Sequence, residues 1–503
     1  MISEMIAGIQ FSTKELFIVS PLIILFLMSL LPLSLKVLRG NKEIRPSVAI
    51  NYAFAGVISA LILVFSFFGE YGQDAYMAFN KAIVLDGVSL VSTVLVLVTT
   101  AISLFYLKEN VATNLKQLSE NIFLIMNSAI GMIIVILSQD LIITFIGVEI
   151  MSLCLYILIA LSHEGSLSKE ASFKYFLLGS FASAIFLYGI AFIYGSTATT
   201  SLIDLRSLWD GLSVNRLLFV GVILTVVGFC FKVAVAPFHA WAPDVYEGSS
   251  TPLTGFMATG VKAATFIAFL RFMTLGVLED PKVEGFTMVL EWLAVLTMIV
   301  GNVAAIMQER LKRMLAYSSI AHSGYVMLAL IAASLGGESV LGASGVIYYL
   351  LVYTAMTLGA FGIISYLERH YEELITFNHL KGLATSHPWL SFSFSVFLLS
   401  LAGVPPTLGF VGKFYIFTAA IEQKLYWAVG WGVLASVVSV YYYLKPIVYL
   451  YMFKADTETV PIEGRKPLTG LAFAFAVVFV LGGLFFIDPI YNFIFRSSSY
   501  LFG

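Results

Sequence analysis

Long apolar runs alternate with short polar connections over almost the whole chain. A helix needs about 20 mostly apolar residues to cross the hydrocarbon core of a bilayer. Runs of that length lie near 16–38, 48–69, 84–107, 121–138, 141–161, 173–194, 216–241, 252–275, 285–307, 314–334, 341–366, 389–421, 426–453 and 466–494. The pattern predicts an all-α polytopic membrane protein of about fourteen transmembrane helices. We expect the first run to be a retained helix rather than a cleaved signal, because polar residues surround Glu4, Lys14 and Glu15 before it.

Proline interrupts two of these runs. The seventh contains Pro237 within AVAPFHAW, and the twelfth contains Pro405 and Pro406 within AGVPPTLGF. Proline removes a backbone donor, and a membrane tolerates the broken helix only where protein or a wet cavity satisfies the freed groups. Interrupted helices in both halves of a transporter indicate a pathway built on inverted repeats.

The composition supports a lipid environment and narrows the chemistry. Charged residues make up 12% of the chain, against about 25% in a soluble domain. A net charge of −2 gives no electrostatic basis for nucleic-acid binding. Cys154 and Cys230 lie in apolar runs, which favours packing over a disulfide or a metal site. No phosphate loop, dinucleotide fingerprint or ligand-spaced cluster occurs, so we expect no cofactor or metal in this chain.

Lysine and arginine are distributed unevenly among the connections. If the N-terminus lies outside, the cytoplasmic connections hold about twice as many basic residues as the outer ones, as the positive-inside rule requires. We therefore expect a multi-pass protein of the cell (inner) membrane with both termini outside the cytoplasm.

We interpret seven ionisable groups as buried within the spans, where a charge costs at least about 2.5–3.5 kcal/mol. They are Lys174, Lys232, Lys262, Lys413, Lys445, Glu149 and His322. At about 1.5 Å of rise per residue, five of them fall roughly 13–16 Å from a span end, near the middle of a core about 30 Å thick. These five are Glu149, Lys232, Lys262, His322 and Lys413. Such an arrangement predicts a lateral chain of proton sites.

Glu149 and Lys232 are the pair for which a direct contact is predicted. Removal from water disfavours a charged lysine, and a nearby carboxylate favours it, so the pair would control when Lys232 holds a proton. The alternative is a purely structural ion pair between helices.

Several polar residues in the runs can also be explained by structural roles that do not involve proton transfer. Lys174 and Lys445 lie near enough to span ends to extend to the interface. His322 is either a proton site or a hydrogen-bonded packing residue. Asp86 is interpreted as a helix-start or interfacial acid, and the tyrosines as lipid-facing and packing side chains.

Four segments resemble the antiporter-like membrane subunit family, which includes subunits of proton-pumping NADH:quinone oxidoreductase (complex I). They are SQDLIITFIGVEIMSLCLYIL (138–158), FKVAVAPFHAWAPDVYEGSSTPLTGFMATGVKAATF (231–266), QERLKRMLAYSSIAHSGY (308–325) and LAGVPPTLGFVGKFYIF (401–417). The resemblance implies that helices 4–8 and 9–13 form two inverted five-helix repeats with helices 7 and 12 broken. It also implies proton-pathway roles for six residues: Glu149, Lys174, Lys232, Lys262, His322 and Lys413.

The resemblance also implies a division of the chain and of the chemistry. We expect helices 1–3 in 1–120, the repeats in 121–275 and 285–453, and helix 14 in 466–503. The chain would be a proton-translocating subunit of the oxidoreductase, a translocase, beside other membrane subunits that include sister antiporter-like chains. Flavin, iron–sulfur clusters and quinone would belong to partner subunits. The alternative is a subunit of a multi-subunit cation/proton antiporter or of a membrane-bound hydrogenase.

Two features argue against particular sister subunits of the family. The chain ends nine residues after its last predicted span, which disfavours the largest sister subunit with its long C-terminal lateral helix. Position 413 is lysine, whereas another sister carries glutamate there.

Overall fold

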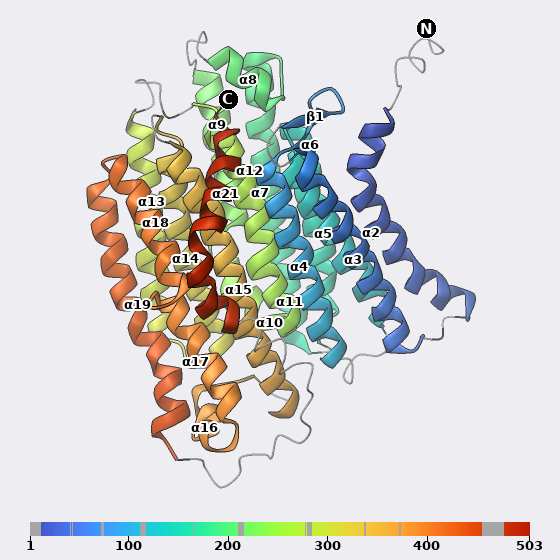
Figure 1. The fold of residues 1–503 in the computed structure, drawn as a ribbon, viewed down its shortest axis with the longest axis vertical. Coiled ribbons are helices and arrows are strands. Elements are labelled where there is room, and N and C mark those ends of the chain that lie inside the picture. The colour runs from blue at the N-terminus through green and yellow to red at the C-terminus, as the bar shows by residue number, and fades with distance from the viewer. Residues whose placement is uncertain are drawn as a thin grey trace.

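The computed structural model describes residues 12–502 except 41, 43, 72–74, 111–116, 164, 210–215, 277, 279–283, 337–338, 372–373 and 455–476. Within this part, 12 helices are long and apolar enough to cross a membrane. Two further spans each consist of two half-helices, so the prediction of about fourteen spans is confirmed. The spans form one bundle, and α2 begins at the same end of the bundle at which α21 finishes (Figure 1).

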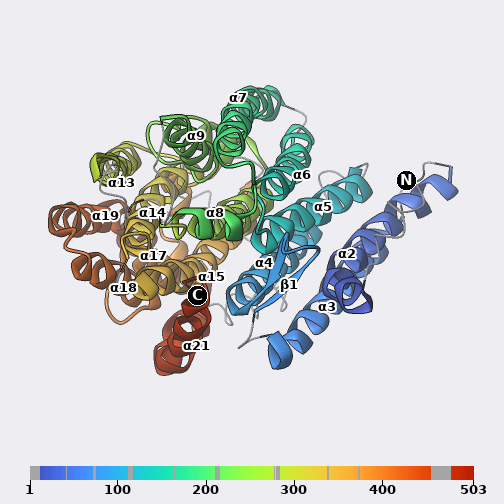
Figure 2. The same ribbon diagram turned by 90° about the horizontal axis from the view of Figure 1, so that it is seen from above.

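The first three spans are α2 (Thr13–Leu38), α3 (Pro46–Tyr71) and α4 (Gly87–Asn110). A small antiparallel hairpin, which the sequence did not reveal, connects α3 and α4 through β1 (Tyr76–Ala78) and β2 (Ile83–Leu85). Seen from above, α2 and α3 lie at the edge of the molecule away from α13, α18 and α19 (Figure 2).

The first five-helix repeat runs from α5 to α12. Its helices are α5 (Leu118–Leu137), α6 (Leu141–Ala160), α7 (Ser166–Thr197), the short connecting α8 (Leu202–Trp209), α9 (Arg216–Lys232), α10 (Trp241–Gly248), α11 (Thr251–Phe256), the π-helix η2 (Met257–Val261) and α12 (Lys262–Met273). The last three form one continuous span, which is buried throughout.

The second repeat runs from α13 to α19, and one span follows it. Its helices are α13 (Glu284–Ile306), α14 (Leu311–Ala333), α15 (Ser339–Tyr371), the 3-10 helix η4 (Phe377–Leu380), α16 (Leu383–Ser386), α17 (Pro388–Ala402), α18 (Leu408–Glu422) and α19 (Tyr426–Met452). The described part of the last span covers Val477–Ser499, including η5 (Gly483–Phe486) and α21 (Ile487–Ser499). The start predicted for this span, 466–476, lies outside the described residues.

The helix ends and helix contacts follow from local chemistry. Asp140 caps α6, because its carboxylate accepts hydrogen bonds from two backbone N–H groups of the first turn. Glycines let helix backbones approach closely, as membrane helices require. A Cβ atom on Gly131 would lie 2.6 Å from the backbone of α6, and one on Gly301 would lie 2.5 Å from the backbone of α14.

Both predicted helix breaks are present. The seventh span ends its first half at Lys232 and resumes at Trp241 after the cis peptide bond between Ala236 and Pro237. The twelfth span ends its first half at Ala402 and resumes at Leu408. Gly403 has φ +81°, a left-handed conformation that glycine adopts without strain, so it ends α17.

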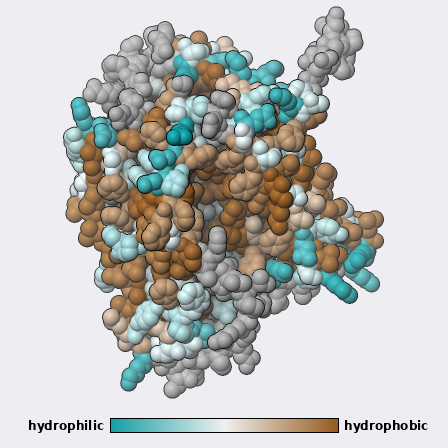
Figure 3. Space-filling view, viewed as in Figure 1, coloured by the Kyte–Doolittle hydropathy of each residue, from teal (hydrophilic) through white to brown (hydrophobic). Residues whose placement is uncertain are grey.

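Burial sorts the helices into a centre and a periphery. The Thr251–Met273 span, α14 and α15 are almost wholly buried, whereas α2 exposes most of its surface. Brown hydrophobic atoms cover the middle of the visible face, and teal hydrophilic atoms gather mainly towards its two ends (Figure 3). The outer helices therefore present apolar side chains to lipid, and the polar groups inside the spans lie at the centre of the bundle.

Candidate functional site

Lys232 lies at the break of the seventh span. It is the last residue of α9, and its side chain is buried with the residue 4% exposed. Its ammonium donates a hydrogen bond of 2.8 Å to Ser152 Oγ on α6. The carbonyl end of a helix carries partial negative charge, so the break places a cation where the backbone favours one.

Glu149 lies one turn before Ser152 on α6, but its side chain is bonded to α7 and not to Lys232. Its carboxylate accepts a hydrogen bond from the Ser183 hydroxyl on α7. Among the ion pairs of the described residues none joins Glu149 to Lys232. The predicted direct contact is therefore absent, because each charged group is bonded to a serine.

Lys262 begins α12 directly after the π-helical turn Met257–Val261. Single π-helical turns within α-helices occur frequently at functional sites. The ammonium of this 3% exposed residue donates to the Ser319 carbonyl, to Ser319 Oγ at 2.6 Å and to Ser323 Oγ at 2.8 Å. All three donors of the lysine are thus satisfied by neutral acceptors from α14.

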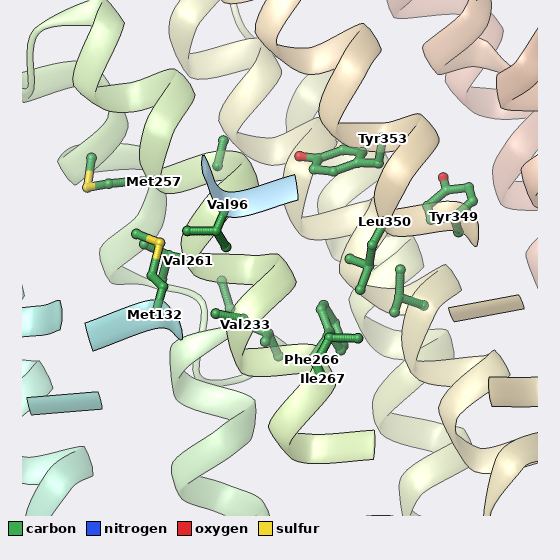
Figure 4. Packing of buried hydrophobic residues seen from close by; sticks show 14 of the residues in the cluster. Val96, Met132, Val233, Met257, Val261, Phe266, Ile267, Tyr349, Leu350 and Tyr353 are labelled. Atoms are coloured by element: carbon green, nitrogen blue, oxygen red, sulfur yellow. The ribbon is translucent and has the colours of Figure 1, made fainter. Parts of the chain in front are cut away.

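Hydroxyl groups join Lys262 to both repeats. Ser323 Oγ donates to the carbonyl of Val233, the residue after Lys232, at 2.6 Å. On the other side, the Tyr353 hydroxyl donates to Ser319 Oγ at 2.8 Å. Val233 and Tyr353 lie on opposite sides of the apolar packing in Figure 4. A hydroxyl both donates and accepts, so these groups form a hydrogen-bonded connection across the centre of the bundle.

His322 lies next along this connection, 3% exposed. Its Nδ1 contacts the Tyr349 hydroxyl on α15, and its Nε2 lies 2.9 Å from the Tyr443 hydroxyl on α19. The ring is 5.2 Å from that of Tyr353, measured between centroids. Tyr349 and Tyr353 are four residues apart and therefore project from one face of α15, as Figure 4 shows.

Lys413 lies at the break of the twelfth span. Its ammonium donates to the carbonyl of Ala402, the last residue of α17, at 2.8 Å and to Ser436 Oγ at 3.0 Å. The Tyr325 ring centroid is 4.9 Å from Nζ, within the range of a cation–π interaction. Tyr325 also packs edge-on against His322, with 5.8 Å between centroids. The two broken spans therefore each place a buried ammonium at the carbonyl end of a half-helix.

The buried lysines share one property. Lys232, Lys262 and Lys413 are each at most 4% exposed, and no carboxylate of the described residues forms an ion pair with any of them. An isolated buried charge is costly, and hydrogen bonds from neutral acceptors offset only part of that cost. Burial without a carboxylate partner is the kind of environment in which a lysine can give up its proton, as a proton carrier must.

The structure places four of the six predicted site residues among shared neighbours, and Glu149 lies one turn from Ser152, the residue that accepts from Lys232. We call Glu149, Lys232, Lys262, His322 and Lys413 the polar row. Lys174 is not part of it: the Lys174 side chain is 42% exposed and forms ion pairs with Glu170 at 2.7 Å and Asp244 at 2.8 Å. Lys445 is also elsewhere, with its ammonium 4.4 Å from the Phe377 ring centroid.

Sequence analysis missed the hydroxyl groups that surround the row: it interpreted the tyrosines as lipid-facing or packing residues, and several of the buried ones also form hydrogen bonds. The missed residues are Ser152, Ser183, Ser319, Ser323, Tyr349, Tyr353 and Tyr443. A signal existed in YYLLVY (348–353), where tyrosines recur at a four-residue spacing inside an apolar run.

Asp86 and Arg271 form a buried ion pair outside the row. Asp86 starts α4, as predicted, by accepting from the Ser89 N–H, but it also forms an ion pair of 2.9 Å with Arg271. Both side chains are at most 3% exposed. Among the described residues, no group of three His, Cys, Asp or Glu side chains is placed to hold a metal ion.

Comparisons with known proteins show the family to which the chain belongs. A family model described as NADH:quinone oxidoreductase/Mrp antiporter, TM, matches residues 138–439. The chain is 47% identical over 486 residues to NADH-quinone oxidoreductase subunit N of Bdellovibrio bacteriovorus, covering 95% of this chain and 98% of that protein. It is 39% identical over 383 residues to the subunit N of Trichlorobacter lovleyi, covering 76% and 77%.

Solved structures extend the similarity to three dimensions. A chain of respiratory complex I from Thermus thermophilus, solved with bound aureothin, matches with a TM-score of 0.78 and 32% identity, over 94% of this chain and 98% of that one. A chain of the Mrp complex from a Dietzia species matches with a TM-score of 0.82 over 98% of both chains. Its identity is 20%, so that likeness concerns the fold alone.

Proposed function

Because this chain belongs to the NADH:quinone oxidoreductase/Mrp antiporter transmembrane family, in which its relatives are subunit N of NADH-quinone oxidoreductase, we propose that the polar row carries its protons. The chain is a proton-translocating membrane subunit of the oxidoreductase and performs its work inside that complex. The observation that carries the assignment of the row is the burial of three lysines whose ammonium groups are bonded to neutral acceptors.

The row supports transfer in steps between chemically similar sites. Lys262 is connected through the Ser323 hydroxyl to the carbonyl of Val233, the residue after Lys232, whose own ammonium is bonded to Ser152. From Lys262 the connection continues through Ser319 and Tyr353 to the His322 ring. Lys413 follows beyond Tyr325. Glu149 acts on Lys232 by charge from the outer end of the row.

The proposal also concerns orientation, domains and partners. With both termini outside the cytoplasm, Lys413 would be the terminal site that releases protons outward. The repeats are assigned to 121–275 and 285–453, flanked by 1–120 and 466–503. The neighbours would be other membrane subunits, including sister antiporter-like chains. Flavin, iron–sulfur clusters and quinone would be held by partner subunits, so no redox step occurs in this chain.

A cation/proton antiporter subunit is the competing function. The Mrp likeness supports only a shared fold at 20% identity, whereas relatives at 39–47% identity are oxidoreductase subunits. Co-purification with flavin- and quinone-binding chains would distinguish the two functions, because an antiporter would lack them.

Lys232→Ala tests the proposal, and Lys445→Ala is the matched control, since Lys445 is a lysine within a span but outside the row. Both variants should assemble, because neither lysine forms a carboxylate pair in the described residues. In inverted membrane vesicles, NADH-driven acidification should be largely lost with Lys232→Ala and retained with Lys445→Ala. Acidification at the wild-type rate with Lys232→Ala would contradict the proposal.

A further inference from the structure

A cluster of charges surrounds α10, the second half of the broken seventh span. The Arg313 guanidinium lies 2.8 Å from Asp244 and 2.8 Å from Glu247, both on α10. Asp244 also pairs with Lys174 at 2.8 Å, and Glu247 pairs with Arg310 at 2.5 Å. We call these five residues the α10 latch. It belongs to the lower half of the bundle in Figure 1, away from the end at which α2 begins.

The latch joins the two repeats. Lys174 lies on α7 and both carboxylates on α10, all within the first repeat, whereas the two arginines precede or begin α14 of the second repeat. Lys312, in the same turn of α14, donates to the carbonyl of Ser249 at the end of α10 at 2.7 Å. The first turn of α14 therefore holds α10 at its carboxylates and at its C-terminus.

The position of α10 affects the backbone next to Lys232. Trp241 begins α10, and its indole N–H donates to the carbonyl of Phe231, directly before Lys232, at 3.0 Å. The Val233 carbonyl, directly after Lys232, accepts from Ser323 of α14. A shift of α10 relative to α14 would thus move one side of Lys232 while α14 holds the other.

We infer that Arg313 is a positioning residue for proton transfer. By binding both carboxylates of α10, it fixes the second half of the broken helix against the second repeat and so sets the spacing between Lys232 and Lys262. This inference rests on the proposed function of the polar row. Lys174 then acts as the first-repeat partner in the latch, through Asp244, rather than as a member of the row.

The residues of the latch differ in ways that allow a controlled comparison. Arg313 contacts two carboxylates with a side chain 30% exposed, whereas Arg310 forms an ion pair with one carboxylate of the described residues, Glu247, and its side chain is 50% exposed. Ion pairs that are partly exposed to solvent contribute little to overall stability, so loss of either arginine should leave assembly intact. A change in transfer geometry would then be seen in pumping and not in the amount of complex.

The experiment compares Arg313→Gln, Arg313→Lys and Arg310→Gln in inverted vesicles that contain the whole oxidoreductase. At equal complex abundance, Arg313→Gln should lower NADH-driven acidification about fivefold, a factor that corresponds to about 1 kcal/mol and that the loss of two partly exposed ion pairs together can supply. Arg313→Lys keeps the charge and should recover most of the rate. Arg310→Gln should stay near the wild-type rate.

Equal acidification by Arg313→Gln and Arg310→Gln would overturn the inference, and so would a loss that Arg313→Lys does not repair. If Arg313→Gln does not accumulate, Asp244→Asn tests the same contact from α10 by the same criteria. Lys232→Ala in parallel vesicles separates the two proposals. If Lys232→Ala pumps normally, the proposed function of the polar row is refuted. If Lys232→Ala pumps poorly and Arg313→Gln pumps normally, only the inference about the α10 latch is refuted.

Discussion

Ser323 is the hydroxyl that connects Lys262 to the first helix break, and Ser323→Ala should impair pumping. The substitution removes an acceptor 2.8 Å from the Lys262 ammonium and deprives the Val233 carbonyl of its donor at 2.6 Å. A hydrogen bond to a charged group contributes about 1.5–3 kcal/mol. Since each 1.4 kcal/mol is about a factor of ten, the charged form of Lys262 becomes roughly 10- to 150-fold harder to populate.

We therefore expect NADH-driven acidification of inverted vesicles to fall about tenfold or more with Ser323→Ala. Ser319 still supplies two acceptors for Lys262, so the complex should assemble. Ser334→Ala is the matched control. Ser334 lies at the end of the same helix, is equally buried at 2%, and bonds only to the nearby Ile331 carbonyl at 2.8 Å. If the two variants pumped alike at equal abundance, the Ser323 connection would not be part of the transfer route.

Two further substitutions separate charge from geometry within the row. Glu149→Gln should lower vesicle acidification more than Glu149→Asp, because aspartate keeps the charge that acts on Lys232; equal rates would instead assign Glu149 to its bond with Ser183 or to packing. Lys413→Arg should assemble yet pump poorly, because a guanidinium keeps its proton in proteins; normal acidification would show that Lys413 serves as a fixed charge.

The spans and both breaks could be predicted from the sequence because the bilayer imposes a length and proline interrupts the backbone ladder. The rise per residue also gave the depth of each ionisable group. It placed Lys232 and Lys262 at one level, and the structure connects Lys262 through Ser323 to the carbonyl of Val233, the residue after Lys232. Depth along a helix is a local property, so it survives tertiary packing.

The direction in which each side chain points was not predictable in the same way. Glu149 and Lys232 have similar depths, but Glu149 bonds to α7 and Lys232 to α6. Ser152 and Ser183 give no signal in an apolar run, because a buried serine in a helix often bonds only to its own backbone. The strands Tyr76–Ala78 and Ile83–Leu85 are too short for an alternating pattern to reveal.

Helix α14 links the polar row in the middle of the membrane to the α10 latch at the first turn of the same helix. Ser319, His322 and Ser323 are three and four residues apart on α14, so they project from one face and form the centre of the row. Arg313 lies in the first turn of the same helix, at α10. Since a helix moves as a rigid unit over such a length, a displacement of its first turn reaches the hydroxyls around Lys262. The inverted repeats thus meet at α14, where proton position in one repeat can alter the geometry of the other.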